Sequence, residues 1–478
     1  MALSLASNIV LARLLTPEQI GIYSVSLAVI GIAQVLRDFG IGNFLIQEKE
    51  LSEGHIRTAF GISLLLGGIL FAIVFLTAPG AGSFYGQEQI VETMRISSLN
   101  FIVLPFCTIS LALLRREMKF ARLFVVNLTA ASTAVVISIV LAYHGYGPNS
   151  IAVGAVAGNI ATGIGAWLAR AGRPLLLPGL KQWRALVKFG GQSSLTGVVT
   201  SISMDANDLV VGKVLGFFSV AILSRAQGLM NIFHRDLMTA IRGVALPAFA
   251  AAHRRGEDLD AQHGRSVALV TVFAWPFYGV IALYPLEAMR LLFGPQWDAA
   301  VGLVPIFCLA GALAAVVSLV SSLLISLGRI DLVTRAELFL QPLRFCLIAI
   351  AAVVFRSVEA CALAFLAASV VGLPVFMSYK VRALPKHPPL PVGQMLRSIG
   401  VTFISLLPAF VHVGLTGFDR TTPIDLMPMV VSLLLVLLAW IVAVRWLKHP
   451  ICAEPLYLRL FGPLGMPKAV LTKRVARK

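Results

Sequence analysis

The run MPMVVSLLLVLLAWIVAVRW (Met427–Trp446) decides the fold class, because it is long, continuous and apolar. It reaches the roughly 20 residues that a helix needs to cross a hydrocarbon core of about 30 Å. Only helices and closed barrels satisfy all their backbone hydrogen bonds in lipid, and barrel strands would be short and alternating. The run therefore predicts a membrane-spanning helix.

The rest of the chain repeats this pattern. Of its 478 residues, 58% are hydrophobic and only 13% are charged, whereas roughly a quarter are charged in a typical soluble domain. We therefore predict an all-α, polytopic membrane protein with about fourteen transmembrane helices. The predicted spans lie at 1–15, 20–42, 58–78, 93–114, 123–143, 150–169, 189–211, 215–245, 266–286, 300–326, 333–355, 358–379, 394–414 and 427–447.

The basic residues give this topology a direction. Most of the 39 Lys and Arg residues fall in alternate loops, such as RREMKFAR (Arg115–Arg122), and in the C-terminal tail; Arg13 and Lys213 are among the few on the opposite face. Loops rich in Lys and Arg stay cytoplasmic. We therefore expect the bacterial inner membrane, with the C-terminus in the cytoplasm. This topology explains the net charge of +17 by contact with membrane lipids, so no nucleic-acid partner is expected.

Motifs for enzymatic chemistry are missing from the sequence. The five cysteines show neither CxxC nor Cys/His metal spacing, so we expect no disulfide, metal or cofactor. There is no P-loop lysine motif, GxSxG or HExxH. The predicted periplasmic loops are short, which leaves little room for the catalytic loop of a membrane glycosyltransferase or polymerase. We therefore predict that the protein is not an enzyme.

An internal repeat suggests how the spans are organised. NIVLARLLTPEQIGIYS (Asn8–Ser24) aligns without gaps onto DLVVGKVLGFFSVAILS (Asp208–Ser224), which begins six spans later. Two parallel repeats are a transporter design, with the substrate site between the halves. The alternative is a coincidence between two Leu- and Val-rich helices. Far fewer residues precede Asn8 than precede Asp208 in the second copy, so we expect the first helix to be truncated or the true start to lie upstream of Met1.

The repeat and the composition together predict the domain boundaries. Two six-helix bundles would be followed by a Pro-rich basic linker and two additional helices. The predicted parts are an N-terminal bundle at 1–185, a C-terminal bundle at 186–380, a cytoplasmic linker at 381–393, two helices at 394–447 and a basic cytoplasmic tail at 448–478.

Polar side chains recur at helical spacing along the seventh and eighth predicted spans. Charged groups at membrane depth cost roughly 2.5–3.5 kcal/mol each on insertion scales, so they usually face an aqueous cavity or a partner. Guanidinium groups bind phosphate in a forked geometry, and the acidic residues would separate the arginines or take up a coupling ion. Interhelical salt bridges that only join the two spans remain the alternative. The candidate substrate-binding residues are Asp205, Asn207, Asp208, Arg225, Gln227, Asn231, Arg235 and Arg242.

A set of short segments, in order along the chain, resembles the polysaccharide transporters, which are the lipopolysaccharide and exopolysaccharide flippases of the multidrug/oligosaccharidyl-lipid/polysaccharide exporter superfamily. The segments are ARLLTPEQIG (Ala12–Gly21), RDFGIGNFLIQ (Arg37–Gln47), LLRREMKFARL (Leu113–Leu123), VKFGG (Val187–Gly191), LSRAQGL (Leu223–Leu229), ALPAF (Ala245–Phe249), FGPQW (Phe293–Trp297) and SLLISLGRID (Ser322–Asp331). The resemblance runs from the first residue to about residue 380.

This resemblance implies two six-helix bundles around a cationic cavity. It also implies translocation of an undecaprenyl-pyrophosphate-linked oligosaccharide to the periplasmic leaflet by alternating access, together with a polysaccharide polymerase and glycosyltransferases of the same pathway as partners. Relatives often read Asn-x-Asp-Asn where this chain has Asp205-Ala206-Asn207-Asp208, so the acidic and amide positions are exchanged here. Two functional alternatives stay open: a multidrug-type, ion-coupled antiporter, which would need an acidic cavity, and a flippase for the peptidoglycan lipid precursor.

Overall fold

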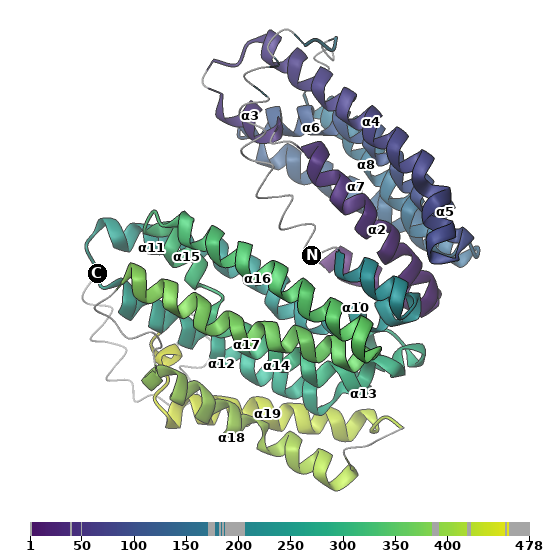
Figure 1. Cartoon of the computed structure of the whole chain (residues 1–478). Helices are drawn as coiled ribbons and strands as arrows, with labels where there is room; N and C mark the ends of the chain where they lie inside the picture. Colours follow the sequence, from purple (N-terminus) through teal and green to yellow (C-terminus); the bar gives the residue numbers. More distant parts are fainter. Residues whose placement is uncertain are drawn as a thin grey trace. The chain divides into compact units, whose positions relative to one another are not determined.

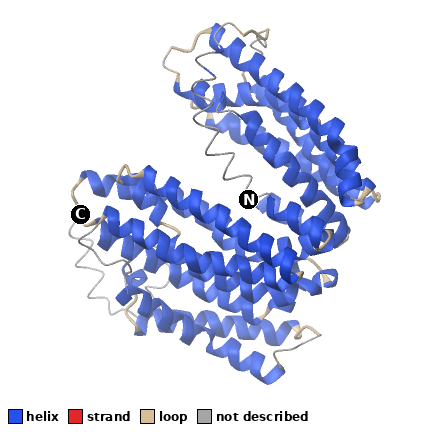
Figure 2. Cartoon of the chain, in the orientation of Figure 1, coloured by secondary structure: helices blue, strands red, loops and turns tan. Residues whose placement is uncertain are grey.

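The computed structural model describes residues 2–38, 41–48, 50–170, 177–180, 183, 186, 206–384, 392–417, 422–454 and 457. Within these ranges the chain forms helices joined by short loops, and none of the described residues is in a strand (Figure 2). The predicted all-α fold class is confirmed.

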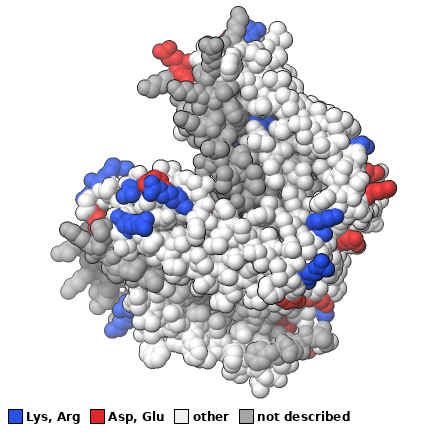
Figure 3. Space-filling model, in the orientation of Figure 1, with Lys and Arg blue, Asp and Glu red and all other residues white. Residues whose placement is uncertain are grey.

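Eleven helical segments of the described part are long and apolar enough to cross a membrane. They include α2 (Pro17–Asp38), α4 (Glu53–Tyr85), α7 (Phe120–Tyr143), α8 (Pro148–Ala169), α12 (Leu259–Leu283), α17 (Val358–Ala383), α18 (Val392–Thr416) and α19 (Leu426–Trp446). The other three segments combine shorter helices: α5 (Glu88–Ser98) with α6 (Asn100–Arg116); a 3₁₀ helix (Pro295–Leu303) with α14 (Val304–Val317) and α15 (Val320–Ser326); and α16 (Ile330–Ile350) with a π-helix (Ala351–Phe355). Figure 3 shows a broad uncharged surface on this face, with the visible charged side chains gathered in a few patches.

Three of the fourteen predicted spans are not among these eleven. Span 1–15 corresponds to α1 (Ala2–Leu14), which has only 13 residues. Span 215–245 corresponds to α10 (Phe217–Asn231), a π-helix (Ile232–Leu237) and α11 (Met238–Arg254). Most of span 189–211 lies outside the described residues. The number fourteen therefore stays a prediction.

The chain divides into two compact units, which are coloured by sequence in Figure 1. Unit 1 contains Met1–Ala226, Met289–Ala300 and Glu337–Ala368, and unit 2 contains Gln227–Ala288, Val301–Ala336 and Ser369–Lys478. Most of the predicted linker and of the predicted C-terminal tail lies outside the described residues. The predicted domain boundaries stay predictions.

In unit 1, capping groups and small residues define the helices. The Ser52 hydroxyl accepts a hydrogen bond from the His55 amide at 3.3 Å, and the His55 ring accepts one from the Ser52 amide, so both ends of a capping box begin α4. In the α7–α8 pair, a Cβ atom on Gly154 would lie 2.7 Å from the Ala134 carbonyl oxygen. Small residues thus let these two helices approach closely, as is common in membranes.

Basic residues of the RREMKFAR loop cap the ends of other helices in unit 1. Arg116 donates to the carbonyls at the end of α3 (Ile41–Gln47), with distances of 3.0 Å to Leu45 and 2.6 Å to Glu48. Arg122 donates to the Ala169 carbonyl at the end of α8, at 2.6 Å. Cations are favourable at helix C-termini, where carbonyls lack intrahelical partners. Part of the basic charge therefore fixes helix ends.

In unit 2, the two C-terminal helices pack against α12. Val272 of α12, Val401 of α18 and Trp440 of α19 are buried in one cluster, and the Trp440 indole donates to the Val272 carbonyl at 3.0 Å. At the other end of these helices, the Tyr284 hydroxyl lies 3.0 Å from the His412 ring and 2.7 Å from the Ser432 hydroxyl. The additional helices are thus an integral part of unit 2.

The two copies of the sequence repeat have the same helix boundaries. In the first copy α1 ends at Leu14 and α2 begins at Pro17. In the second copy the helical residues 206–214 end at Val214, and α10 begins at Phe217. These positions correspond in the gap-free alignment, which supports a true repeat over coincidence.

Candidate functional site

Arg225 of α10 is held by aromatic rings in unit 1. Its guanidinium carbon lies 4.9 Å from the Trp297 ring centroid and 5.2 Å from that of Phe293. No described acidic residue forms an ion pair with Arg225, and its buried Nε atom has no hydrogen-bond partner. The two rings stabilise the cation by cation–π interaction without neutralising it. We call Arg225, Phe293 and Trp297 the aromatic cage.

The segment that carries both rings is fixed to the end of α1. Trp297 is fully buried, and its indole nitrogen donates to the Ala12 carbonyl at 2.9 Å. Gln296 also donates to the Ala12 carbonyl and, at 3.0 Å, to that of Leu15. A two-pronged ion pair between Arg290 and Asp298, at 2.9 and 2.6 Å, closes the turn between α13 (Pro285–Leu292) and the 3₁₀ helix. The cage geometry is therefore set by backbone contacts.

This arrangement favours an anion. Arg225 lies in the predicted eighth span, where a guanidinium is costly unless it meets a counter-charge or water, and the cage provides no carboxylate. An incoming phosphate or diphosphate would supply the missing charge and accept forked hydrogen bonds. An organic cation would be repelled by the same group.

The other candidate residues are distributed over both units. Asn207 and Asp208, in the helical residues 206–214, are half-buried and belong to unit 1 with Arg225. In unit 2, Gln227 and Asn231 of α10 are half-buried. Asp205 lies outside the described residues.

Two arginines of the predicted stripe differ in their surroundings. The Arg235 side chain is 68% exposed and pairs with Asp236 at 3.0 Å. Arg242 is half-buried, and its Nη2 lies 3.5 Å from the His234 carbonyl. Arg225 is thus the candidate arginine that combines a buried Nε atom, aromatic contacts and the absence of an acidic partner within the described part of the chain.

A π-helix (Ile232–Leu237) changes the spacing that the sequence pattern assumed. It follows α10 directly and contains Arg235. The Tyr278 hydroxyl donates to the Met230 carbonyl at 3.3 Å, just before the widened turn, and Phe233 packs against Tyr278 with ring centroids 5.8 Å apart. Single π-turns inside α-helices frequently occur at functional sites.

Sequence reasoning did not identify the two cage rings as site residues. Phe293 and Trp297 lie far from Arg225 along the chain, and only folding brings them together. The signal that could have indicated them was the FGPQW segment itself, in which a Gly-Pro turn places an indole donor after an apolar helix.

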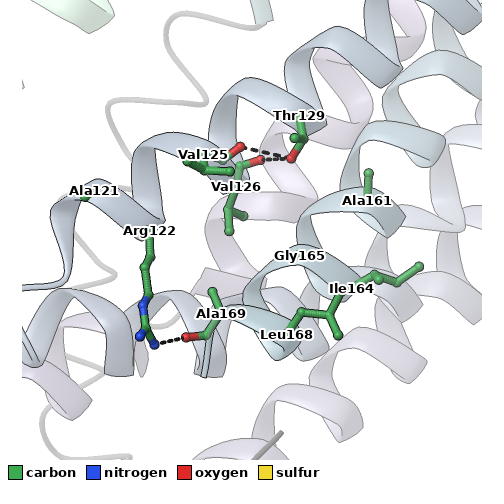
Figure 4. A pocket seen from close by; sticks show the side chains of 10 residues that line it. All are labelled: Ala121, Arg122, Val125, Val126, Thr129, Ala161, Ile164, Gly165, Leu168 and Ala169. Carbon is green, nitrogen blue, oxygen red and sulfur yellow. Dashed lines mark hydrogen bonds between the residues drawn. The ribbon is translucent and has the colours of Figure 1, made fainter. Parts of the chain in front are cut away.

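Each unit has an apolar groove. The groove in unit 1, of about 800 Å³, lies between α7 and α8, and its polar groups are already bonded: Arg122 to Ala169, and Thr129 to two carbonyls of its own helix (Figure 4). The groove in unit 2, of about 790 Å³, is lined by α12, α14 and α18 and includes Trp275 and Phe410. Their linings suit hydrocarbon chains.

Comparison with known proteins places the chain in a family. The profile of the family described as "Polysaccharide biosynthesis protein" matches residues 10–302. The lipopolysaccharide biosynthesis protein WzxC of Escherichia coli (strain K12) is 25% identical over 345 residues, which are 71% of this chain and 69% of WzxC. The succinoglycan biosynthesis transport protein ExoT of Rhizobium meliloti (strain 1021) is 24% identical over 60% of this chain and 58% of ExoT.

Among solved structures, the lipid II flippase MurJ in an inward closed conformation has the same fold. The TM-score is 0.76, with 15% sequence identity, over 94% of this chain and 97% of MurJ. The fold and the profile match agree with the resemblance seen in the sequence. The chain belongs to the polysaccharide biosynthesis protein family.

Proposed function

We propose that this protein is an inner-membrane flippase that moves an undecaprenyl-pyrophosphate-linked oligosaccharide from the cytoplasmic to the periplasmic leaflet. The observation that carries the proposal is Arg225, a half-buried arginine with a buried Nε atom, caged by two aromatic rings and left without an acidic partner in the described part of the chain. The diphosphate of the lipid carrier is the anion that this group would bind.

Family membership and fold support the same substrate class. The relatives WzxC and ExoT are named for polysaccharide biosynthesis and transport, and MurJ is named a lipid II flippase. The apolar grooves offer room for hydrocarbon chains. The polyprenyl tail would therefore remain in an apolar environment, in lipid or along a groove, while the head group crosses. The polymerase and glycosyltransferases of the same pathway would be the functional partners.

The mechanism we propose is alternating access about the internal repeat. The matching helix boundaries of the two copies support two related halves, and parallel repeats move against each other around a fixed site. Arg225 would hold the diphosphate by contacts that differ between the inward- and outward-facing states, since a ligand shifts an equilibrium only through such differences. The C-terminus would lie in the cytoplasm.

Reconstitution with variants of two arginines tests the role of Arg225. Full-length protein in liposomes would be given a radiolabelled undecaprenyl-diphosphate oligosaccharide, and its appearance in the opposite leaflet followed with time. Hydrogen bonds to charged groups contribute about 1.5–3 kcal/mol, so Arg225→Ala should lower the initial rate roughly 10- to 100-fold. Arg225→Lys keeps the positive charge but loses the forked hydrogen bonds, so its transport rate should lie between that of the unmodified protein and that of Arg225→Ala.

Arg235→Ala is the matched control, because that side chain is exposed and already paired with Asp236. It should stay within about 2-fold of the unmodified protein. A normal rate for Arg225→Ala at equal reconstitution would remove Arg225 from the site. Faster transport of the peptidoglycan precursor than of sugar-repeat substrates would favour that alternative cargo.

A further inference from the structure

Two basic residues at equivalent positions of the repeat cap helix ends across the repeat. Arg13 aligns with Lys213. Arg13 donates through Nη2 to the Leu291 carbonyl at 2.5 Å and through Nε to the Leu292 carbonyl at 3.4 Å, at the end of α13. Lys213 donates to the Phe84 carbonyl, at the end of α4. Each copy of the repeat thus supplies a cation to a helix end in the other half of the sequence.

The two receiving helix ends are themselves alike. α4 closes on Gly86 with φ of 71°, and α13 is followed by Gly294 with φ of 99°. Left-handed glycines of this kind end helices and leave their last carbonyls open to other donors. Phe84 and Leu292 occupy the same position relative to these glycines, so the two basic residues reach corresponding carbonyls, and Arg13 reaches the Leu291 carbonyl as well.

A second pair of contacts runs in parallel with the first. The Tyr85 hydroxyl donates to the Leu209 carbonyl at 3.2 Å, beside Lys213. The Trp297 indole donates to the Ala12 carbonyl at 2.9 Å, beside Arg13. Each basic residue therefore lies near the C-terminal end of a helix whose backbone accepts a hydrogen bond from an aromatic side chain close to the capped end.

All of these residues lie in unit 1, and Arg13 and Lys213 belong to the face that we predict to be periplasmic. Both side chains are exposed at their helix ends, so a change in the approach of the repeats can break the contacts without leaving a buried charge.

We propose that Arg13 and Lys213 form a reciprocal clasp that joins the first hairpin of each repeat to a helix end in the other repeat, on the predicted periplasmic face, and that this clasp opens in each transport cycle. This role rests on the proposed function, because a clasp that opens implies alternating access. The clasp would set the population of the conformation seen in this structure, whereas Arg225 would bind the diphosphate of the substrate.

The distance between two spin labels reports whether the clasp is closed or open, and this measurement needs no substrate. Glu88 and Phe218 are exposed near the Lys213 contact, at the start of α5 and α10. Their replacement by cysteine, in a chain whose five native cysteines are replaced, allows the distance between the two labels to be measured in liposomes. A cation at a surface helix end contributes about 0.3–1 kcal/mol. Lys213→Ala should therefore raise the population of long distances about 2- to 5-fold, and Lys213→Ala with Arg13→Ala about 3- to 25-fold.

Arg13→Ala alone should also raise the population of long distances between the labels at positions 88 and 218, although these labels lie near Lys213. The reason is that a reciprocal clasp couples the Arg13 contact to the Lys213 contact. The control is Arg95→Ala, which removes an exposed cation of α5 that stacks on Phe75 and caps no described helix end. A distance distribution that responds to Lys213→Ala but not to Arg13→Ala, or to neither, would overturn the clasp.

A cross-link then connects the clasp to transport. Phe84→Cys with Lys213→Cys, joined by a short thiol cross-linker that reduction can cleave, should stop transport of the labelled lipid, and reduction should restore it. Transport at the unlinked rate after complete cross-linking would contradict the proposal. Absence of transport in the unlinked and unmodified proteins would instead count against the proposed function, and the spin-label result would still stand.

Discussion

Gly21 lies where α2 crosses α10, and it leaves no room for a side chain. A Cβ atom added there would overlap the Phe217 carbonyl oxygen, come within 2.5 Å of the carbonyl carbon and within 2.9 Å of the Phe217 Cβ. The first two obstacles are backbone atoms, which cannot rotate away. Gly21→Ala must therefore move one helix relative to the other within unit 1.

The expected effect of Gly21→Ala is a loss of stability and of transport together. Overpacking a tight contact costs typically 1–3 kcal/mol, and the upper end applies here because rigid backbone is displaced. The apparent melting temperature in detergent should fall by at least about 3 °C, and the transport rate should fall with it, because the crossing joins the two repeats next to the clasp.

Gly68→Ala provides the matched control. Gly68 lies inside α4, is exposed, and has nothing within 4 Å of an added Cβ atom. Alanine is favoured over glycine in helices by roughly 0.5–1 kcal/mol, so this variant should melt at the same temperature or higher. If Gly21→Ala matched Gly68→Ala in both melting temperature and rate, the close approach of α2 and α10 would be wrong.

Three further predictions follow from individual contacts. Trp297→Phe keeps a ring beside Arg225 but removes the hydrogen bond to Ala12; it should cost about 0.5–1.5 kcal/mol in a thermal scan and change the rate less than Arg225→Ala does. Lys380→Met removes the ammonium that lies 2.6 Å from the Asp260 carboxylate, with Lys380 only 2% exposed; loss of one partner of a buried pair costs about 3–5 kcal/mol, and Lys380→Met with Asp260→Leu should recover much of the melting temperature. Burial, with a smaller effect of Arg397, lowers the pKa of His449 from 6.5 to about 4. The unfolded chain therefore binds this proton first, and the stability that His449 contributes is lost as the pH falls from about 6.5 through about 4; a melting curve of His449→Gln against pH should be flatter over that window, and an equal slope would contradict the assignment.

The sequence predicted those features that local patterns determine. Apolar runs of sufficient length predicted the all-α membrane fold. The two copies of the repeat, which begin at Asn8 and at Asp208, have matching helix boundaries in the structure. The candidate residues included Arg225 because it lies close to the helically spaced polar residues of the eighth predicted span, and such spacing within one segment is visible in the chain itself.

Features that depend on long-range packing or on irregular backbone were not predictable in this way. The π-helix at Ile232–Leu237 carries no residue pattern that separates it from an α-helix, so Arg235 was grouped with Arg225 although it is exposed and paired. The alignment also places Gly21 opposite Ala221, which suggests that alanine is acceptable there. Only the position of Phe217 shows why it is not.

The most direct test of the central claim is the distribution of lipid-linked oligosaccharide between the leaflets in a strain that lacks this protein. Undecaprenyl-linked units would be recovered from each leaflet and identified by mass spectrometry, alongside the yield of surface polysaccharide. Our account predicts loss of surface polymer with the lipid-linked units retained on the cytoplasmic side, and restoration by the unmodified gene but not by one encoding Arg225→Ala. Units that reach the periplasmic leaflet at normal levels in the deletion strain would contradict it.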